Sequence, residues 1–196
     1  PDGASRSLVV TSAIQGEGKT ATTLNLAIAM SEVEDHRIIV LDFDLRRPRV
    51  EDFLGLDRGP GLNELLTGSV ELETVIRSSG IAGLDVIGAG VRAVPPSELV
   101  SSRRVDELLG RLKEEYNYIL IDTPPSLPLT DAGVLSAKSD GTLLVVALEK
   151  SPRSLVKEAL SNLQDLGANM LGTFVTGIRG ADPSSDRRYR YYSEEE

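Results

Sequence analysis

Residues 9–30 read VVTSAIQGEGKTATTLNLAIAM, an apolar run that breaks into glycines, a lysine and a threonine before apolar residues return with helical spacing. Ala13-x-x-x-x-Gly18-Lys19-Thr20 satisfies the looser P-loop pattern, in which the first small residue is Ala. Glycines 16 and 18 would let consecutive N–H groups point at phosphate oxygens, at the positive end of the following helix. Lys19 would reach the β- and γ-phosphates, and the Thr20 hydroxyl would ligate Mg²⁺. The alternative is an ordinary strand-to-helix turn, but the strand before and the helix after are the context that a P-loop requires.

The composition bounds the class of protein. The 196 residues are 40% hydrophobic and 26% charged, as in one globular domain that buries roughly 70% of its unfolded surface. The chain has no cysteine, which excludes disulfides and iron–sulfur clusters and fits a reducing cytoplasm. No apolar run approaches the ~20 residues that span a bilayer. A net charge of −9 argues against general nucleic-acid binding, which needs a basic surface. The chain starts at Pro1 without a Met, so we expect a fragment of a longer polypeptide.

Apolar runs alternate with amphipathic stretches along the chain. Runs rich in Val, Ile and Leu are typical of strands buried on both faces of a parallel sheet; they are Leu8–Val10, Ile38–Phe43, Leu84–Ile87, Tyr118–Ile121, Leu143–Leu148 and Leu171–Val175. Helices are predicted over Thr20–Met30 and Arg103–Glu115. A third would have Ser151 as N-cap, Pro152 as first residue and Gly167 as its stop. The alternation predicts an α/β fold with a doubly wound, mainly parallel sheet and helices on both faces.

Carboxylates follow two of these strands. Asp42 and Asp44 end the run IIVLDFD, and Asp122 ends YILID. A carboxylate at the tip of a buried strand is costly to desolvate without a compensating charge, and Mg²⁺ beside a P-loop would supply it. Each aspartate alone is as readily explained as the start of a loop. Three of them with a P-loop in one sheet favour the metal.

The last residues differ from the rest of the chain. The stretch GADPSSDRRYRYYSEEE loses all aliphatic periodicity and is charged and rich in tyrosine. We therefore expect a folded domain over residues 1–180 and a flexible tail over 181–196.

Taken together, these motifs resemble the Walker A, A′ and B elements of bacterial tyrosine kinases, P-loop enzymes that govern capsule and exopolysaccharide synthesis. AIQGEGKT is similar to Walker A, LDFDLRRP to the A′ element, and ILIDTPP to Walker B. GAGVRAVPPSELVSS is similar to the family's Pro-rich turn before a helix, and Tyr189, Tyr191 and Tyr192 to its tyrosine cluster. Gln15 stands where relatives usually carry Pro, and Thr176 where they often carry Asn near the adenine.

The resemblance implies a role for each site residue. ATP would be held by Gln15, Gly16, Glu17, Gly18, Lys19, Thr20, Ala21 and Thr176. Mg²⁺ would be held by Thr20, Asp44 and Asp122. Lys19, Asp42, Asp44 and Asp122 would form the catalytic set, with Asp42 accepting the phenolic proton, and the tail tyrosines would be the phosphoacceptors. Arg46 and Arg47 would pair with phosphate or with a neighbouring subunit, or else form a solvated basic turn.

The resemblance also implies partners. A membrane adaptor segment would activate the domain, copies would associate through the tail, and a cognate tyrosine phosphatase would reverse the reaction. The protein would be cytoplasmic, at the inner face of the membrane. The competing hypothesis is an ATPase of the cell-division and partitioning group, a nucleotide-switched binding module. That group carries a second lysine early in the P-loop, where this chain has Ile14.

Overall fold

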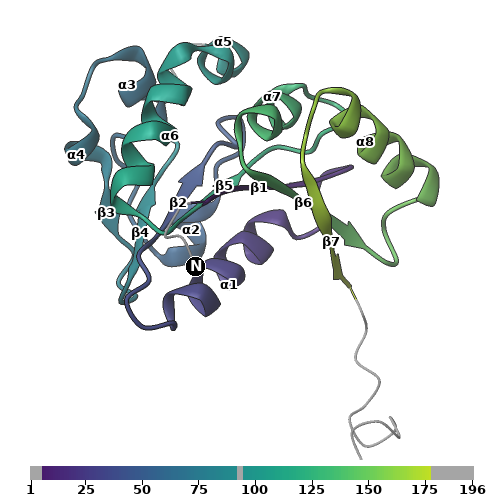
Figure 1. The fold of residues 1–196 in the computed structure, drawn as a ribbon, viewed down its shortest axis with the longest axis horizontal. Coiled ribbons are helices and arrows are strands. Elements are labelled where there is room, and N and C mark those ends of the chain that lie inside the picture. The colour runs from purple at the N-terminus through teal and green to yellow at the C-terminus, as the bar shows by residue number, and fades with distance from the viewer. Residues whose placement is uncertain (1–5, 92–94, 178–196) are drawn as a thin grey trace, which may run out of the picture.

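A computed structural model describes residues 6–91 and 95–177 of the chain (Figure 1). Its sheet has the strand order β3-β4-β2-β5-β1-β6-β7, and every pair is parallel except β3 with β4. The strands are β1 (Arg6–Ser12), β2 (Ile38–Asp42), β3 (Arg77–Ser78), β4 (Leu84–Ile87), β5 (Tyr118–Asp122), β6 (Gly141–Ala147) and β7 (Met170–Thr176). The predicted doubly wound, mainly parallel sheet is confirmed.

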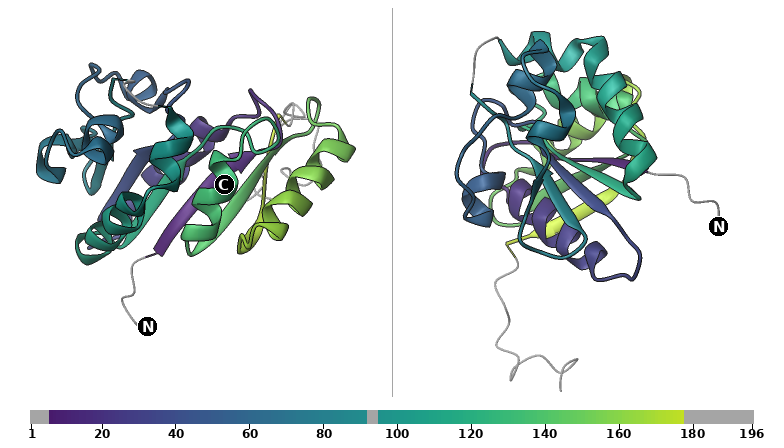
Figure 2. Two further views of the ribbon diagram at one scale, coloured as in Figure 1. Left: turned by 90° about the horizontal axis from the view of Figure 1, so that it is seen from above. Right: turned by 90° about the vertical axis from the view of Figure 1, so that its left-hand side faces the viewer.

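Helices cover both faces of the sheet (Figures 1 and 2). They are α1 (Lys19–Ser31), α2 (Val50–Leu54), α3 (Leu62–Thr67), α4 (Leu72–Val75), α5 (Pro96–Ser101), α6 (Arg103–Glu115), α7 (Asp131–Lys138) and α8 (Arg153–Asp165). The two helices predicted from periodicity, over 20–30 and 103–115, correspond to α1 and α6.

Strand β2 shows why both faces need helices. Its side chains alternate between two separate apolar clusters, because successive residues of a strand point to opposite faces. Ile38 and Val40 join Leu24 and Ala27 of α1, whereas Ile39 and Leu41 join the cluster that contains the buried leucines of α6. All five residues of β2 are buried. A third cluster, under α8, is centred on Leu144, Ala159 and Leu163.

The edge of the sheet that β7 forms differs from the prediction. The sequence predicts a strand at residues 171–175 that is buried on both faces, and this is wrong. β7 is an edge strand, and Leu171, Phe174 and Val175 are 59%, 45% and 40% exposed. A strand at the edge of a sheet can have the same apolar composition as a strand in its middle. Composition alone therefore did not show that β7 is an edge strand. Strand β6 likewise ends at Ala147, which leaves Leu148 in the following turn and 58% exposed.

Helix α8 also begins differently. Ser151 is not its N-cap, because the helix starts at Arg153 after Pro152 and receives no side-chain cap. The Ser151 hydroxyl instead accepts a hydrogen bond from Ala147 N–H and donates one to Glu17 of the glycine-rich loop. The predicted stop is confirmed, since Gly167 follows the helix with φ of 88°.

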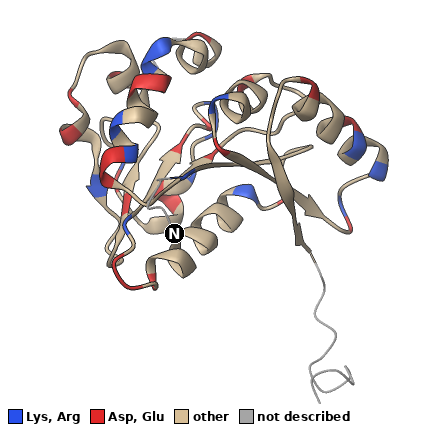
Figure 3. Ribbon diagram, viewed as in Figure 1, with Lys and Arg blue, Asp and Glu red and all other residues tan. Residues whose placement is uncertain are grey.

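Among the described residues no helix is long and apolar enough to cross a membrane. Acidic and basic residues are interspersed along α6 and α8 (Figure 3). The tail tyrosines Tyr189, Tyr191 and Tyr192, and the predicted domain boundary at residue 181, lie outside the described residues.

Candidate active site

The glycine-rich loop joins β1 to α1 at the carboxyl edge of the sheet. Gly16 and Gly18 adopt φ of 78° and 95°, a left-handed conformation that side chains disfavour. Gly18 is the N-cap of α1, so the helix begins at Lys19 with its free N–H groups and positive dipole end at the loop. This is the geometry that binds phosphate at a helix N-terminus.

Glu17 fixes the shape of this loop from behind. Its side chain is only 1% exposed, and its carboxylate accepts hydrogen bonds from Ile14 N–H at 2.6 Å and from the Ser151 hydroxyl. The Glu17 carbonyl accepts a bond from the Thr176 hydroxyl at 2.7 Å, and Lys150 Nζ donates to Gly16 O at 3.1 Å. The loop is therefore tied to the β6–α8 connection and to the end of β7, and these bonds stabilise its curved form.

A cleft of about 580 Å³ opens over the loop. It is bounded by the loop and the start of α1, by residues after β2, and by the segment after β5; the lining residues are Gln15, Gly16, Gly18, Lys19, Thr20, Ala21, Asp44, Arg46, Arg47, Arg49, Phe53, Pro124, Pro125, Pro128 and Leu129. Its volume falls in the range of small-molecule and cofactor sites. Most residues predicted to bind nucleotide thus line one cavity.

Asp122 ends β5 directly beside the loop. It is 1% exposed, and its Oδ2 accepts a hydrogen bond from the Thr20 hydroxyl at 2.6 Å. Burial raises the pKa of Asp122 to about 7, against the lowering effects of the Thr20 bond and the Lys19 charge. Within the described part of the chain, Asp122 Oδ1 is buried without a hydrogen-bond partner. One oxygen of this carboxylate therefore has hydrogen-bonding capacity that the described residues leave unused.

Asp42 ends the adjacent strand β2, and both oxygens of its carboxylate accept hydrogen bonds. It is fully buried, and three backbone N–H groups donate to its carboxylate: Asp44 at 3.2 Å, and Arg49 and Val50 at 3.0 Å each. Burial raises its pKa well above the ordinary value, and the neighbouring Asp122 adds to that rise. The carboxylate closes the loop after β2 and satisfies the first N–H groups of α2.

Asp44 and the arginines follow on the same loop. Burial raises the pKa of Asp44, opposed by Arg47 N–H and by the Lys19 ammonium. The guanidinium of Arg46 lies 3.3 Å from the buried Asp131 carboxylate at the start of α7. Arg46 therefore joins the loop after β2 to α7, while it and Arg47 also line the cleft.

These residues fit Mg²⁺ bound together with a nucleotide. No group of three or more His, Cys, Asp or Glu side chains forms a metal cage in the described ranges. Mg²⁺ is usually held by one or two carboxylates with substrate phosphates and water. The unpaired Asp122 Oδ1 beside the Thr20 hydroxyl, with Asp44 on the cleft wall, provides that kind of partial site.

Four predicted site residues in the described part of the chain do not line the cleft. Glu17 and Thr176 support the loop from behind through their mutual bond, Asp42 is enclosed by backbone, and Asp122 is buried behind Thr20.

Sequence reasoning missed two groups of residues. The first is Ser151 and Lys150, which contact the glycine-rich loop. The second is Arg49 and Phe53, which line the opposite wall of the cleft. Phe53 is an aromatic residue close after the Arg-Arg-Pro turn, and in the structure it is 55% exposed. The Ser151 contact, made across 134 positions, left no signal in the sequence.

The loop, the helix behind it and the paired acidic strand ends define a P-loop ATPase domain. A family model described as an AAA domain matches residues 6–169, and the chain belongs to that family. MinD from Pyrococcus horikoshii, solved with Mg-ADP, shares the fold with a TM-score of 0.74 at 26% identity over 87% of this chain and 70% of MinD.

Within that class, the chain belongs to the bacterial tyrosine-protein kinases. YwqD of Bacillus subtilis is 31% identical over 95% of this chain and 77% of its own length. Tyrosine-protein kinase wzc of Salmonella typhimurium is 32% identical over 96% of this chain and 26% of its own length. The kinase domain of the Escherichia coli tyrosine kinase ETK superposes with a TM-score of 0.86 at 30% identity, over 93% of this chain and 71% of that domain. The chain spans between 22% and 26% of the length of the first curated relatives that it matches.

Proposed function

We propose that this chain is the catalytic domain of an ATP-dependent protein tyrosine autokinase. Its phosphoacceptors are Tyr189, Tyr191 and Tyr192 near the C-terminus, and its phosphorylation state regulates exopolysaccharide or capsule synthesis and export. The observation that carries the proposal is the hydrogen bond from Thr20, which lines a cleft of nucleotide size, to the buried Asp122, whose other carboxylate oxygen has no partner among the described residues. The names of the kinase relatives supply the reaction class.

Transfer requires that the triphosphate be held and its charge neutralised. The N–H groups of residues 15–20 and the Lys19 ammonium bind the phosphates. Thr20, Asp44 and Asp122 would hold Mg²⁺, which would supply positive charge beside the phosphate oxygens. The tyrosine oxygen bonds to the γ-phosphorus as the bond to the bridging oxygen breaks, releasing ADP, and the phenolic proton is lost.

Asp42 is the proposed acceptor of that proton. Its raised pKa gives it affinity for a proton, but a base must also reach the hydroxyl. Since Asp42 is fully buried under the N–H groups of Arg49 and Val50, the role requires the start of α2 to move away when the substrate binds. A phenol of pKa about 10 gives up its proton to a carboxylate only late in the transfer, which suits a loose transition state.

The wider setting is proposed on the same basis. A membrane adaptor segment of a polysaccharide co-polymerase activates the domain at the inner face of the membrane. Copies associate through the tail, and a tyrosine phosphatase resets them. Each phosphate would add about −1.5 to −2 charge to a tail that already ends in Glu194–Glu196, so phosphorylation would release the tail from a protein of net charge −9.

The second candidate is a nucleotide-switched binding module. The likeness to MinD bound to Mg-ADP favours it, because both functions use the same loop. Such a switch hydrolyses ATP but has no need of clustered tyrosines. Mass spectrometry of the protein purified from its host separates the two: phosphate on the tail tyrosines supports the kinase, and ATPase activity with an unmodified tail supports the switch.

The direct test mixes two variants. A Lys19→Met chain keeps its tail but loses a charge directed at the phosphates, while a chain with Tyr189, Tyr191 and Tyr192 changed to Phe keeps its active site. We expect the active chain to label the inactive one from radioactive ATP. If the unmutated protein labels neither itself nor the Lys19→Met chain while it hydrolyses ATP, the kinase proposal is wrong. A folded Lys19→Met chain that labels itself at the normal rate would contradict the role of the loop.

A further inference from the structure

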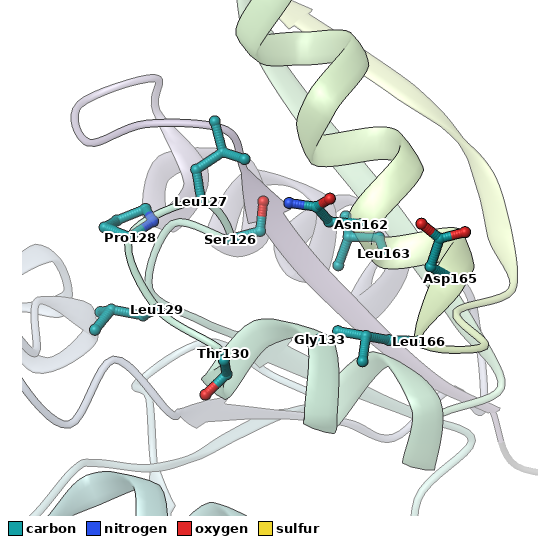
Figure 4. A pocket seen from close by; sticks show the side chains of 10 residues that line it. All are labelled: Ser126, Leu127, Pro128, Leu129, Thr130, Gly133, Asn162, Leu163, Asp165 and Leu166. Carbon is teal, nitrogen blue, oxygen red and sulfur yellow. The ribbon is translucent and has the colours of Figure 1, made fainter.

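A second cavity adjoins the nucleotide cleft, between α7 and α8 (Figure 4). Its volume is about 360 Å³, and its walls are the segment 126–130, Gly133 of α7 and the last turn of α8. Pro128 and Leu129 line both this cavity and the nucleotide cleft. The cavity, called the α7–α8 groove below, therefore continues from the rim of the cleft.

The lining of the groove combines apolar walls with a polar rim. Leu127, Leu129, Leu163 and Leu166 contribute the apolar surface, and Ser126, Thr130, Asn162 and Asp165 the polar groups. Leu166 is 51% exposed. In Figure 4 the Asn162 amide points toward Ser126, and the Asp165 carboxylate stands at the right-hand edge of the cavity. A groove with apolar walls, and with polar groups and one carboxylate at its rim, fits an aromatic ring that carries one polar group.

We propose that the α7–α8 groove is a docking subsite for the segment Arg187–Tyr192 of the tail, and that it holds the ring of one tyrosine while another occupies the cleft. This inference rests on the proposed kinase function. The segment reads RRYRYY, with arginines that can pair with the Asp165 carboxylate at the rim and three amphipathic rings that match the apolar walls.

The geometry of an extended chain permits this arrangement. Residues of an extended chain advance roughly 3.3–3.6 Å each and alternate between two sides, so Tyr189 and Tyr191 point to the same side about 7 Å apart. Two rings on one side of the chain can therefore face two adjoining cavities, and these two share Pro128 and Leu129. The chain from Gly177, where the described structure ends, to Tyr189 extends at most about 40 Å, so the tail of a second copy can leave its own domain to reach the groove.

The test uses a synthetic peptide of residues 184–196 as phosphoacceptor for the full chain. Two groove variants, Asp165→Lys and Leu166→Ser, should each raise the KM for the peptide about tenfold, because one reverses the rim charge and the other removes apolar contact. Their affinities for Mg-ADP, measured by calorimetry, should match the unmutated chain. The matched controls are Glu34→Lys and Val33→Ser in the exposed turn before β2, and they should leave the KM unchanged.

Binding gives a second readout that needs no turnover. Fluorescence anisotropy of the labelled peptide on the Lys19→Met chain should show a dissociation constant about tenfold higher when Asp165→Lys is added, and higher at high salt. A groove variant with normal KM and normal peptide binding overturns the inference while the kinase function stands. A peptide that binds in the groove but is never phosphorylated overturns the kinase function instead. If the groove variants lower self-labelling of the full chain only, with the peptide unaffected, the groove serves another partner and the inference is wrong.

Discussion

The carboxyl ends of β2 and β5 are adjacent in the sheet and chemically alike, yet their carboxylates are hydrogen-bonded differently. Asp42 and Asp122 are register partners, both nearly or fully buried, and burial raises the pKa of each. Asp42 receives three backbone hydrogen bonds, whereas Asp122 receives the Thr20 hydroxyl on one oxygen and has no partner in the described residues for the other.

The difference separates a carboxylate whose oxygens are both engaged by backbone from one that has an oxygen left for a ligand. A saturated carboxylate stabilises the backbone that surrounds it, because each N–H group would otherwise be buried without a partner. A buried carboxylate with an unpaired oxygen destabilises the fold, because that oxygen has lost its hydrogen bonds to water. A ligand that pairs with the oxygen removes this destabilisation when it binds. We therefore expect substitutions at the two positions to affect different measurements.

Asp122→Asn should give the largest effect. The amide preserves size and still offers an oxygen to Thr20, but it removes the negative charge next to the metal position. We expect tyrosine phosphorylation to fall at least about 100-fold, as when a transition-state contact is lost. The thermal midpoint of the protein without ligand should stay equal or rise, because a buried charge is gone. Phosphorylation within threefold of the unmutated chain would show that Asp122 has no part in transfer.

Asp42→Asn should mainly affect folding. The amide has one acceptor oxygen in place of two, so at least one N–H group among Asp44, Arg49 and Val50 loses its partner and faces an NH₂ group. Leaving a buried donor unpaired costs about 1–3 kcal/mol, measurable by urea denaturation. The proposed base role adds slower transfer with unchanged affinity for Mg-ADP. Equal losses of Mg-ADP affinity in the Asn variants of Asp42 and Asp122 would abolish the distinction between the two strand ends.

Part of this comparison was predictable from sequence. Parallel strands that end in Asp42 and Asp122 place both carboxylates at one edge of the sheet, and the glycine spacing around Lys19 identified the loop. Which carboxylate is saturated depends on how the chain returns at Arg49 and Val50, seven and eight residues after Asp42. Local patterns do not encode that return. Ser151 shows the same limit: its sequence context predicts an N-cap, and its actual partner, Glu17, belongs to a distant loop.

The pH dependence of stability and of Mg-ADP affinity should further separate Asp122, at the end of β5, from Asp42, at the end of β2. The folded-state pKa of Asp122, about 7, lies above the value of about 3.9 for an unfolded Asp, so the folded chain binds this proton more tightly. Its contribution to stability is complete below about pH 4 and is lost as the pH rises through 7. Mg-ADP requires the ionised form, so affinity should rise about tenfold in all between pH 6 and pH 8, most of it below pH 7. Calorimetry from pH 6 to 8 checks this, and the same slope in Asp122→Asn would contradict it.

The smallest effect is expected at Glu17, the third buried carboxylate of the site. Both of its oxygens accept hydrogen bonds, so it resembles Asp42, and its function is to position the loop. Ser151→Ala removes one donor to Glu17 and leaves the cleft wall unchanged. Because the remaining bond from Ile14 N–H holds the loop in part, we expect Mg-ADP affinity to fall only about threefold to tenfold, with kcat for transfer unchanged. The matched control is Ser154→Ala, at an exposed position in the first turn of α8. It should change neither the Mg-ADP affinity nor kcat. A lower kcat with normal affinity in Ser151→Ala would mean that Glu17 acts on the reacting groups as Asp122 does, and that saturation by hydrogen bonds does not distinguish structural from functional carboxylates in this site.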